Sequence, residues 1–168
     1  MEKSTTACIT LLSATFLFAE AQTAFDKKLK SLYRNSVATL TPNELSTLMD
    51  SGTSVVLLDI RSPEEYGISH IRTANFLDYD SFTTRMVDKL NKESAIIVYC
   101  SVGYRSERVG EKLKSAGFKN VKNLYGGIFQ WVNEGHPVVN KIGHLTDSVH
   151  TYNENWSQWL TKGIKVYK

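Results

Sequence analysis

A cysteine that follows an apolar segment is the residue of this sequence best suited to covalent chemistry. Cys100 comes directly after residues 95–99, which predict a buried strand, and a helical pattern runs from Ser106 to Gly117. The carboxyl end of a parallel strand faces the crevice in which open α/β sheets bind ligands. The N-terminus of the following helix favours a negative charge and therefore the thiolate form of a cysteine. We expect Cys100 to be a nucleophile.

The loop after the cysteine has the composition of an anion-binding turn. Gly103 can adopt a positive φ and turn backbone amides inward, and Arg105 adds a positive charge. The expected substrate-binding residues are Ser101, Val102, Gly103, Tyr104, Arg105 and Ser106. The alternative, a small buried cysteine without a chemical role, remains open. A phosphatase loop of the CX5R type is not favoured, because only four residues separate Cys100 from Arg105.

The residues CSVGYRS after an apolar strand resemble the active loop of the rhodanese-like single-domain sulfurtransferases. Two further segments resemble the same family: residues 57–76, LLDIRSPEEYGISHIRTANF, and residues 123–139, NLYGGIFQWVNEGHPVV. The resemblance implies a rhodanese-like three-layer α/β fold, with a central parallel sheet and helices on both faces, over residues 37–139. It also implies that Cys100 is catalytic and carries sulfur as a persulfide.

The resemblance further implies a reaction and its partners. Sulfane sulfur would pass from a small anionic donor such as thiosulfate to a thiol, cyanide or protein acceptor, without a metal or organic cofactor. His144 and His150 lack a third ligand, so a zinc site is not expected. The alternative hypothesis is a non-catalytic or redox-sensing module with the same fold, which could use a sulfenate at Cys100. The presence of the cysteine favours the enzyme.

Three residues depart from the usual family pattern in one loop near the site. Ser69 stands where the family usually has glycine, and Arg72 and Thr73 replace a proline-glycine pair. Nearby, Asp59 is expected to be a buried carboxylate paired with Arg61 or bonded to the backbone. His70 is expected to be a structural hydrogen-bonding residue, so neither Asp59 nor His70 is assigned a catalytic role.

The remaining elements follow from capping and periodicity. Thr41 with Glu44, and Ser62 with Glu65, form two capping boxes that each have proline at the first helical position. Strands are predicted at residues 37–40, 54–58, 74–77 and 121–124, and helices at residues 81–90 and at residues 126–135. This alternation of strand and helix predicts a parallel sheet covered on both faces.

The first residues have the pattern of an export signal. Lys3 precedes an apolar segment at residues 7–18, and residues 19–21 form a small-x-small cleavage site. We expect residues 1–21 to be a signal peptide, residues 22–36 to be a linker, and the mature protein to be periplasmic or secreted. The apolar segment is too short to span a bilayer, so no stable membrane insertion is expected after cleavage. Cys100 would then be the sole cysteine of the mature chain.

Composition limits the other possibilities. The chain has 168 residues, 42% of them hydrophobic and 22% charged, which is typical of one globular domain with a modest extension. A net charge of +3 is too small to predict nucleic-acid binding. Residues 140–168 form an aromatic C-terminal extension, in which we expect Tyr152, Trp156 and Trp159 to be buried against the domain, the two tryptophans on a short helix.

Overall fold

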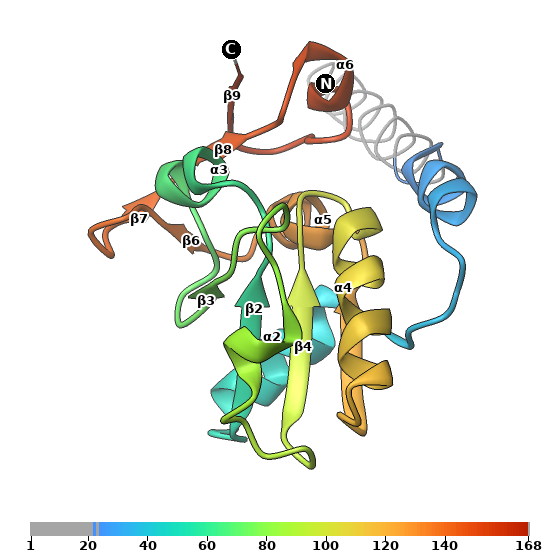
Figure 1. Cartoon of the computed structure of the whole chain (residues 1–168). Helices are drawn as coiled ribbons and strands as arrows, with labels where there is room; N and C mark the ends of the chain where they lie inside the picture. The colour runs from blue at the N-terminus through green and yellow to red at the C-terminus, as the bar shows by residue number, and fades with distance from the viewer. Residues whose placement is uncertain (1–21, 23, 168) are drawn as a thin grey trace, which may run out of the picture. The chain divides into compact units, whose positions relative to one another are not determined.

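The computed structural model of the protein describes Gln22 and residues 24–167 (Figure 1). The predicted signal peptide, residues 1–21, lies outside the described residues. The predicted linker contains a helix at residues 24–32, which belongs to a first compact unit that ends at Leu32. A second unit begins at Tyr33. Over the described residues, no helix has the length and apolar character that crossing a bilayer requires.

The second unit is built around a five-stranded parallel sheet with the order β1-β5-β4-β2-β3. Its strands are β1 (Thr39–Leu40), β2 (Val55–Asp59), β3 (Asn75–Phe76), β4 (Ala95–Tyr99) and β5 (Asn120–Leu124). β4 pairs with β2 on one side and with β5 on the other, and its continuous apolar sequence suits a strand buried on both faces. The predicted α/β class is confirmed.

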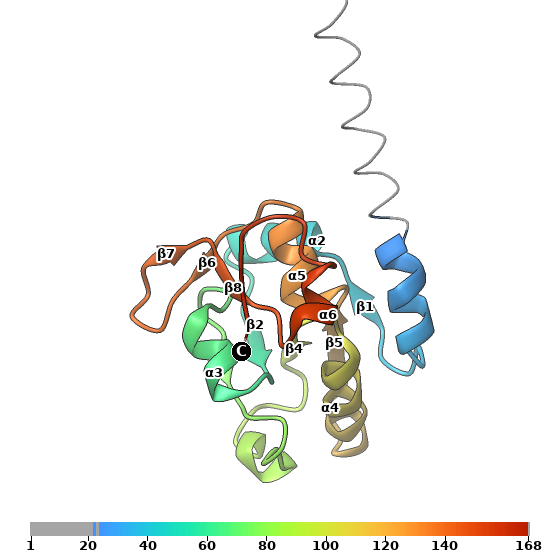
Figure 2. The same cartoon turned by 90° about the horizontal axis from the view of Figure 1, so that it is seen from above.

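Helices cover both faces of this sheet. α4 (Tyr104–Ser115) lies on one face, and α2 (Pro42–Asp50) and α5 (Gly127–Asn133) lie on the other (Figures 1 and 2). α3 (Pro63–Ile68) follows the carboxyl end of β2. Both predicted capping boxes form, at Thr41 for α2 and at Ser62 for α3.

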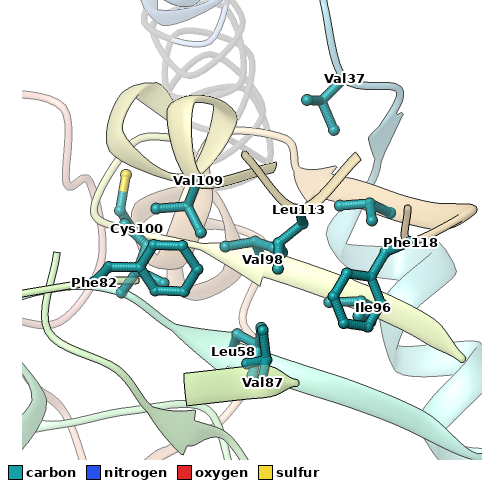
Figure 3. Packing of buried hydrophobic residues seen from close by; sticks show 12 residues of the cluster. Val37, Leu58, Phe82, Val87, Ile96, Val98, Cys100, Val109, Leu113 and Phe118 are labelled. Atoms are coloured by element: carbon teal, nitrogen blue, oxygen red, sulfur yellow. The ribbon is translucent and has the colours of Figure 1, made fainter. Parts of the chain in front are cut away.

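A core cluster lies between the sheet and α4, and Cys100 belongs to it. Successive strand residues point to opposite faces, so Ile96, Val98 and Cys100 share one face. They pack against Val109 and Leu113 of α4. Figure 3 shows Cys100 at the end of this row, beside Val109. The cysteine is therefore directed toward the helix that its own loop begins.

Two predicted helices have different bounds in the structure. The helix predicted at residues 81–90 is wrong, because only a short 3-10 turn, η1 (Thr84–Val87), forms there. Its N-cap, Thr83, makes no side-chain capping bond, and two adjacent β-branched threonines disfavour a regular α-helix. The helix predicted from Ser106 begins two residues earlier, at Tyr104, because Gly103 itself is the N-cap.

The C-terminal extension is folded, but aliphatic residues fill its interior. β6 (Val138–Val139) pairs antiparallel with β7 (Leu145–Thr146), and β8 (Ser148–His150) pairs parallel with β9 (Ile164–Val166), with α6 (Glu154–Ser157) between β8 and β9. Val149 and Leu160 are fully buried, whereas Trp156 and Trp159 are half-buried. The expectation of both tryptophans on a short helix is wrong for Trp159, because α6 ends at Ser157. The expectation of burial is wrong for Tyr152, which is 59% exposed. β8 lies against α3.

The pair expected at the end of β2 is confirmed. Asp59 and Arg61 are both fully buried and form a salt bridge of 2.6 Å. Arg61 also donates to the backbone oxygen of Ser69, which fixes the loop in which the sequence departs from the family pattern. In that loop Thr73 has a φ of 70°, a left-handed conformation that glycine adopts more easily. His70 has a structural role: its ring stacks on Tyr66 and its backbone pairs with Val139.

We predict that Leu160→Ala lowers the free energy of unfolding by about 2–5 kcal/mol, because a buried leucine leaves a cavity when it is truncated. Urea denaturation measures the change. Leu145→Ala is the matched control in the same extension: Leu145 is 68% exposed, so its truncation should change stability by less than about 0.5 kcal/mol. Equal effects of the two substitutions would show that the extension does not contribute a core.

Candidate active site

The sulfur of Cys100 receives a hydrogen bond from the backbone of its own loop. The Gly103 amide nitrogen lies 3.1 Å from the Cys100 Sγ and donates to it. The Ser106 hydroxyl lies 3.5 Å from the same sulfur, but it is 2.7 Å from Asn123 Oδ1. A hydroxyl has one hydrogen, and the shorter contact takes it. The Gly103 amide is therefore the donor directed at the sulfur, whose residue is only 1% exposed.

The backbone conformation at Gly103 produces this geometry. Its φ of 97° lies in the left-handed region, where a side chain would be strained. The residue ends the loop, begins α4, and turns its amide back toward the sulfur. The Asn123 side-chain amide donates to the Gly103 carbonyl oxygen at 2.9 Å, which supports the turn from β5.

Backbone amides at the N-terminus of α5 bond to the cysteine loop. Ile128 N donates to the Cys100 carbonyl oxygen at 2.9 Å, and Phe129 N donates to the Ser101 carbonyl oxygen at 3.1 Å. The first amides of a helix have no partner within the helix, so the loop carbonyls satisfy them. A side chain at Gly127 would place its Cβ 2.3 Å from the Cys100 carbonyl oxygen. Only glycine allows this close approach.

Arg105 makes a two-bonded ion pair with Glu65 of α3. Its Nη1 and Nη2 donate to the two carboxylate oxygens at 2.9 and 2.8 Å. The Ser101 hydroxyl also donates to Glu65, and Arg105 Nη2 lies 3.1 Å from that hydroxyl. The Arg105 side chain is 22% exposed. Sequence reasoning placed Arg105 opposite an anionic donor, and the structure places its guanidinium against a carboxylate of the protein.

These contacts set the charge of Glu65. Burial alone would raise its pKa, but the hydrogen bonds and positive charge of Arg105, aided by the charge of Arg61, lower the pKa to about 2. Burial would lower the pKa of Arg105, and its electrostatic interaction with Cys100 together with the hydrogen bonds and charge of Glu65 raise it instead. Glu65 is therefore an anion and Arg105 a cation over the physiological range.

The other two predicted loop residues lie in different environments. Val102 is buried, and its carbonyl oxygen accepts a hydrogen bond of 2.8 Å from the Tyr33 hydroxyl. Tyr104, at the first position of α4, is exposed, and the Arg108 guanidinium lies 5.4 Å from its ring centroid. The structure thus places these residues in a network at the cysteine loop: Gly103 and Ser106 contact the Cys100 sulfur, and Ser101 and Arg105 bond to Glu65. Tyr104 lies at the surface.

Sequence reasoning missed three residues of this network. Glu65 was assigned only to a capping box, and its second role could not be read from local sequence. Asn123 carried a signal, because a polar residue within a buried strand needs partners. Tyr33 lies in the predicted linker, where nothing local pointed to the cysteine loop.

The histidines of the extension do not gather with other possible metal ligands. His150 Nδ1 accepts a hydrogen bond from the backbone amide of Tyr152 at 3.1 Å. Within Gln22 and residues 24–167, no group of three histidine, cysteine, aspartate or glutamate side chains is placed to hold a metal ion.

Comparison with known proteins agrees with this architecture. A model of the rhodanese-like domain matches residues 41–134. A sulfurtransferase of Allochromatium vinosum is 34% identical over 95 residues, which are 56% of this chain and 88% of that protein. The probable adenylyltransferase/sulfurtransferase MoeZ of Mycobacterium tuberculosis is 34% identical over 60% of this chain, and the match spans only 26% of that longer protein. The solved rhodanese-like domain of an Anabaena protein has a TM-score of 0.57 at 27% identity, covering 62% of this chain and 80% of that domain.

We predict that the ion pair of Glu65 stabilises the fold in a pH-dependent manner. The pKa of Glu65 is lowered from 4.5 to about 2, so its contribution is present above about pH 4.5 and is lost as the pH falls toward 2. At roughly 1.4 kcal/mol per pKa unit, Glu65→Gln should lower the free energy of unfolding at pH 7 by about 3 kcal/mol, and the loss should shrink toward pH 2. Denaturant titrations from pH 7 to pH 2 measure this difference.

Glu44→Gln is the matched control for this prediction. Glu44 makes the equivalent capping-box bonds to Thr41, but it lies at the surface of α2. Its replacement should have a much smaller effect, because no buried cation loses its partner. If the stability difference between Glu65→Gln and the unaltered protein is the same at pH 7 and at pH 2, the ion pair does not have the role described here.

Proposed function

Because the chain belongs to the rhodanese-like family, we propose that it is a sulfurtransferase that carries sulfane sulfur as a persulfide on Cys100. One observation supports this most strongly. The Cys100 Sγ lies at the carboxyl end of the central strand, ahead of the N-terminus of the twelve-residue helix α4, with the Gly103 amide donating to it at 3.1 Å. A negatively charged sulfur is stabilised by both the amide and the helix terminus.

The first step loads the cysteine. The thiolate of Cys100 attacks the outer sulfur of a donor such as thiosulfate, and a new bond forms between the two sulfur atoms. The sulfur–sulfur bond of the donor breaks, and its electron pair leaves on sulfite. The cysteine becomes a persulfide anion, whose terminal sulfur extends beyond Sγ into the loop formed by residues 101–106.

In the second step the persulfide transfers its terminal sulfur. A thiol, cyanide or protein acceptor attacks the terminal sulfur, and the electron pair of the persulfide bond returns to the Cys100 Sγ. With cyanide the product is thiocyanate, and the thiolate is regenerated. Charge is conserved in both steps, so the reaction needs no external oxidant or reductant.

Backbone amides, rather than a bare cation, provide the main stabilisation of the anions in this proposal. The positive charge of Arg105 is matched by the carboxylate of Glu65. Arg105 then holds Ser101 and the loop in place, while the Gly103 amide, at the N-cap of α4, donates to the sulfur. An anionic donor is bound by residues 101–106 through the same amides.

We predict that Cys100→Ser lowers thiosulfate:cyanide sulfur transfer to the uncatalysed rate, because the change removes the nucleophile and leaves a side chain of similar size. Intact-protein mass spectrometry after incubation with thiosulfate should show the gain of one sulfur atom in the unaltered protein and none in this variant. Cys8→Ser, made in the full chain of residues 1–168, is the control, because it removes the other cysteine of the sequence and should leave the sulfur gain unchanged. A Cys100→Ser protein that still gains sulfur and turns over would refute the mechanism.

The same proposal includes export of the protein, on the sequence pattern of residues 1–21. We predict that the protein isolated from its own cells begins at or close to Gln22. N-terminal sequencing of the periplasmic or secreted fraction measures this directly. Recovery from the cytoplasm with Met1 or Glu2 at the N-terminus would exclude a cleaved export signal.

A further inference from the structure

We propose that Tyr33 is a positioning residue for the sulfur-carrying cysteine, acting through the peptide that joins Val102 to Gly103. Tyr33 precedes the region matched by the rhodanese-like domain, which begins at residue 41. The inference rests on the proposed role of Cys100. It concerns how the protein orients the hydrogen-bond donor that faces the sulfur.

The Tyr33 hydroxyl joins two loops at the carboxyl edge of the sheet. It donates to the Val102 carbonyl oxygen at 2.8 Å, in the loop between β4 and α4. It accepts a hydrogen bond of 3.0 Å from the amide of Gly126, in the turn between β5 and α5. One phenol therefore holds the cysteine loop at a fixed distance from the turn between β5 and α5.

The peptide geometry links this contact to the sulfur. The Val102 carbonyl and the Gly103 amide belong to the same planar trans peptide, so they point in opposite directions. When Tyr33 holds the carbonyl oxygen on one side, the Gly103 N–H must point to the other side. There it lies 3.1 Å from the Cys100 Sγ. Tyr33 thereby fixes the direction of an amide that it does not touch.

The contacts form a continuous chain of hydrogen bonds. The Gly126 amide donates to the Tyr33 hydroxyl, the hydroxyl donates to the Val102 carbonyl, and the amide of that peptide donates to the Cys100 sulfur. In such chains each bond polarises the next and strengthens it. Accepting a bond at the carbonyl makes the Gly103 N–H a better donor to a negative sulfur.

The packing of Tyr33 against Gly103 fixes the position of the phenol. A Cβ at Gly103 would lie 2.0 Å from the Tyr33 hydroxyl oxygen and 2.7 Å from the ring carbon that carries it. The absence of a side chain at Gly103 thus leaves the space that the phenol occupies. The Tyr125 ring meets the Tyr33 ring edge-on, with centroids 6.0 Å apart. Burial raises the pKa of Tyr33 well above its ordinary value, so the hydroxyl keeps its hydrogen.

The segment that carries Tyr33 is bound to α4 as well. The buried Glu107 carboxylate accepts hydrogen bonds from Arg34 N at 2.9 Å, and from Ser36 N at 3.0 Å. The Ser36 carbonyl oxygen accepts from Lys114 Nζ at 2.8 Å. Since α4 begins in the cysteine loop, the segment and the loop are fixed to the same helix.

Tyr33→Phe tests the proposal, because it removes the hydroxyl and keeps the ring. We expect iodoacetamide to alkylate Cys100 about tenfold more slowly in this variant at pH 7, because the hydrogen bond from the Gly103 amide to the Cys100 thiolate is weakened. The amide proton resonance of Gly103 should move upfield, as its bond to sulfur lengthens. Neither measurement needs a sulfur donor, so they stand or fall separately from the transfer reaction.

Tyr66→Phe is the matched control. The Tyr66 hydroxyl also donates to a backbone carbonyl, that of Ala74, at 3.1 Å. Its loss should lower stability to a similar extent and leave both the alkylation rate and the Gly103 resonance unchanged. The proposal is overturned if Tyr33→Phe alters neither readout, or if Tyr66→Phe slows alkylation equally. Fast exchange of the Gly103 amide with solvent in the unaltered protein would also overturn it.

Discussion

The turn at Gly103 is the constraint on which the site depends. The chain leaves the central strand fully buried and must begin α4 within three residues of Cys100, with the sulfur facing the helix terminus. A positive φ at this one residue starts the helix and directs its own amide at the sulfur. A side chain is excluded twice, by the backbone conformation and by the Tyr33 hydroxyl. The same residue therefore determines the local fold, the packing and the electrostatic environment of the cysteine.

The buried charges beside this turn are arranged in pairs. Asp59 with Arg61, and Glu65 with Arg105, lie where β2 and β4 end. A buried charge without a partner would cost several kcal/mol, whereas a hydrogen-bonded pair can be retained. Glu65 also belongs to the capping box of α3. Its pair with Arg105 therefore joins the start of α3 to the cysteine loop that precedes α4. Pairing leaves little bare positive charge at the site, and the donor that reaches the sulfur is a backbone amide, that of Gly103.

The parts of the structure that could be predicted from the sequence are those with local signals. The two capping boxes, the continuous apolar strand before Cys100 and the pair of Asp59 with Arg61 each involve residues close together in the chain. The pair of Glu65 with Arg105 joins residues forty positions apart, and Tyr33 meets Val102 across sixty-nine. Such contacts depend on how distant elements pack, and no local pattern encodes them. The error at residues 81–90 has the opposite cause, since helical periodicity was present but the capping bond that starts a helix was not.

Segments outside residues 41–134 take part in holding the cysteine loop. On the N-terminal side, Tyr33 binds the loop itself, and Ser36 binds Glu107 of the helix that follows it. On the C-terminal side, β8 lies against α3, the helix that presents Glu65 to Arg105. The cysteine loop therefore has two supports that the sheet alone does not provide: Tyr33 bonds to the Val102–Gly103 peptide, and β8 packs on the helix whose Glu65 pairs with Arg105. A fragment limited to the matched region would keep Cys100 and its strand, but it would lose the phenol that orients the amide and the strand that packs against α3. The precision of the site is thus a property of the unit that begins at Tyr33, rather than of the shared domain by itself.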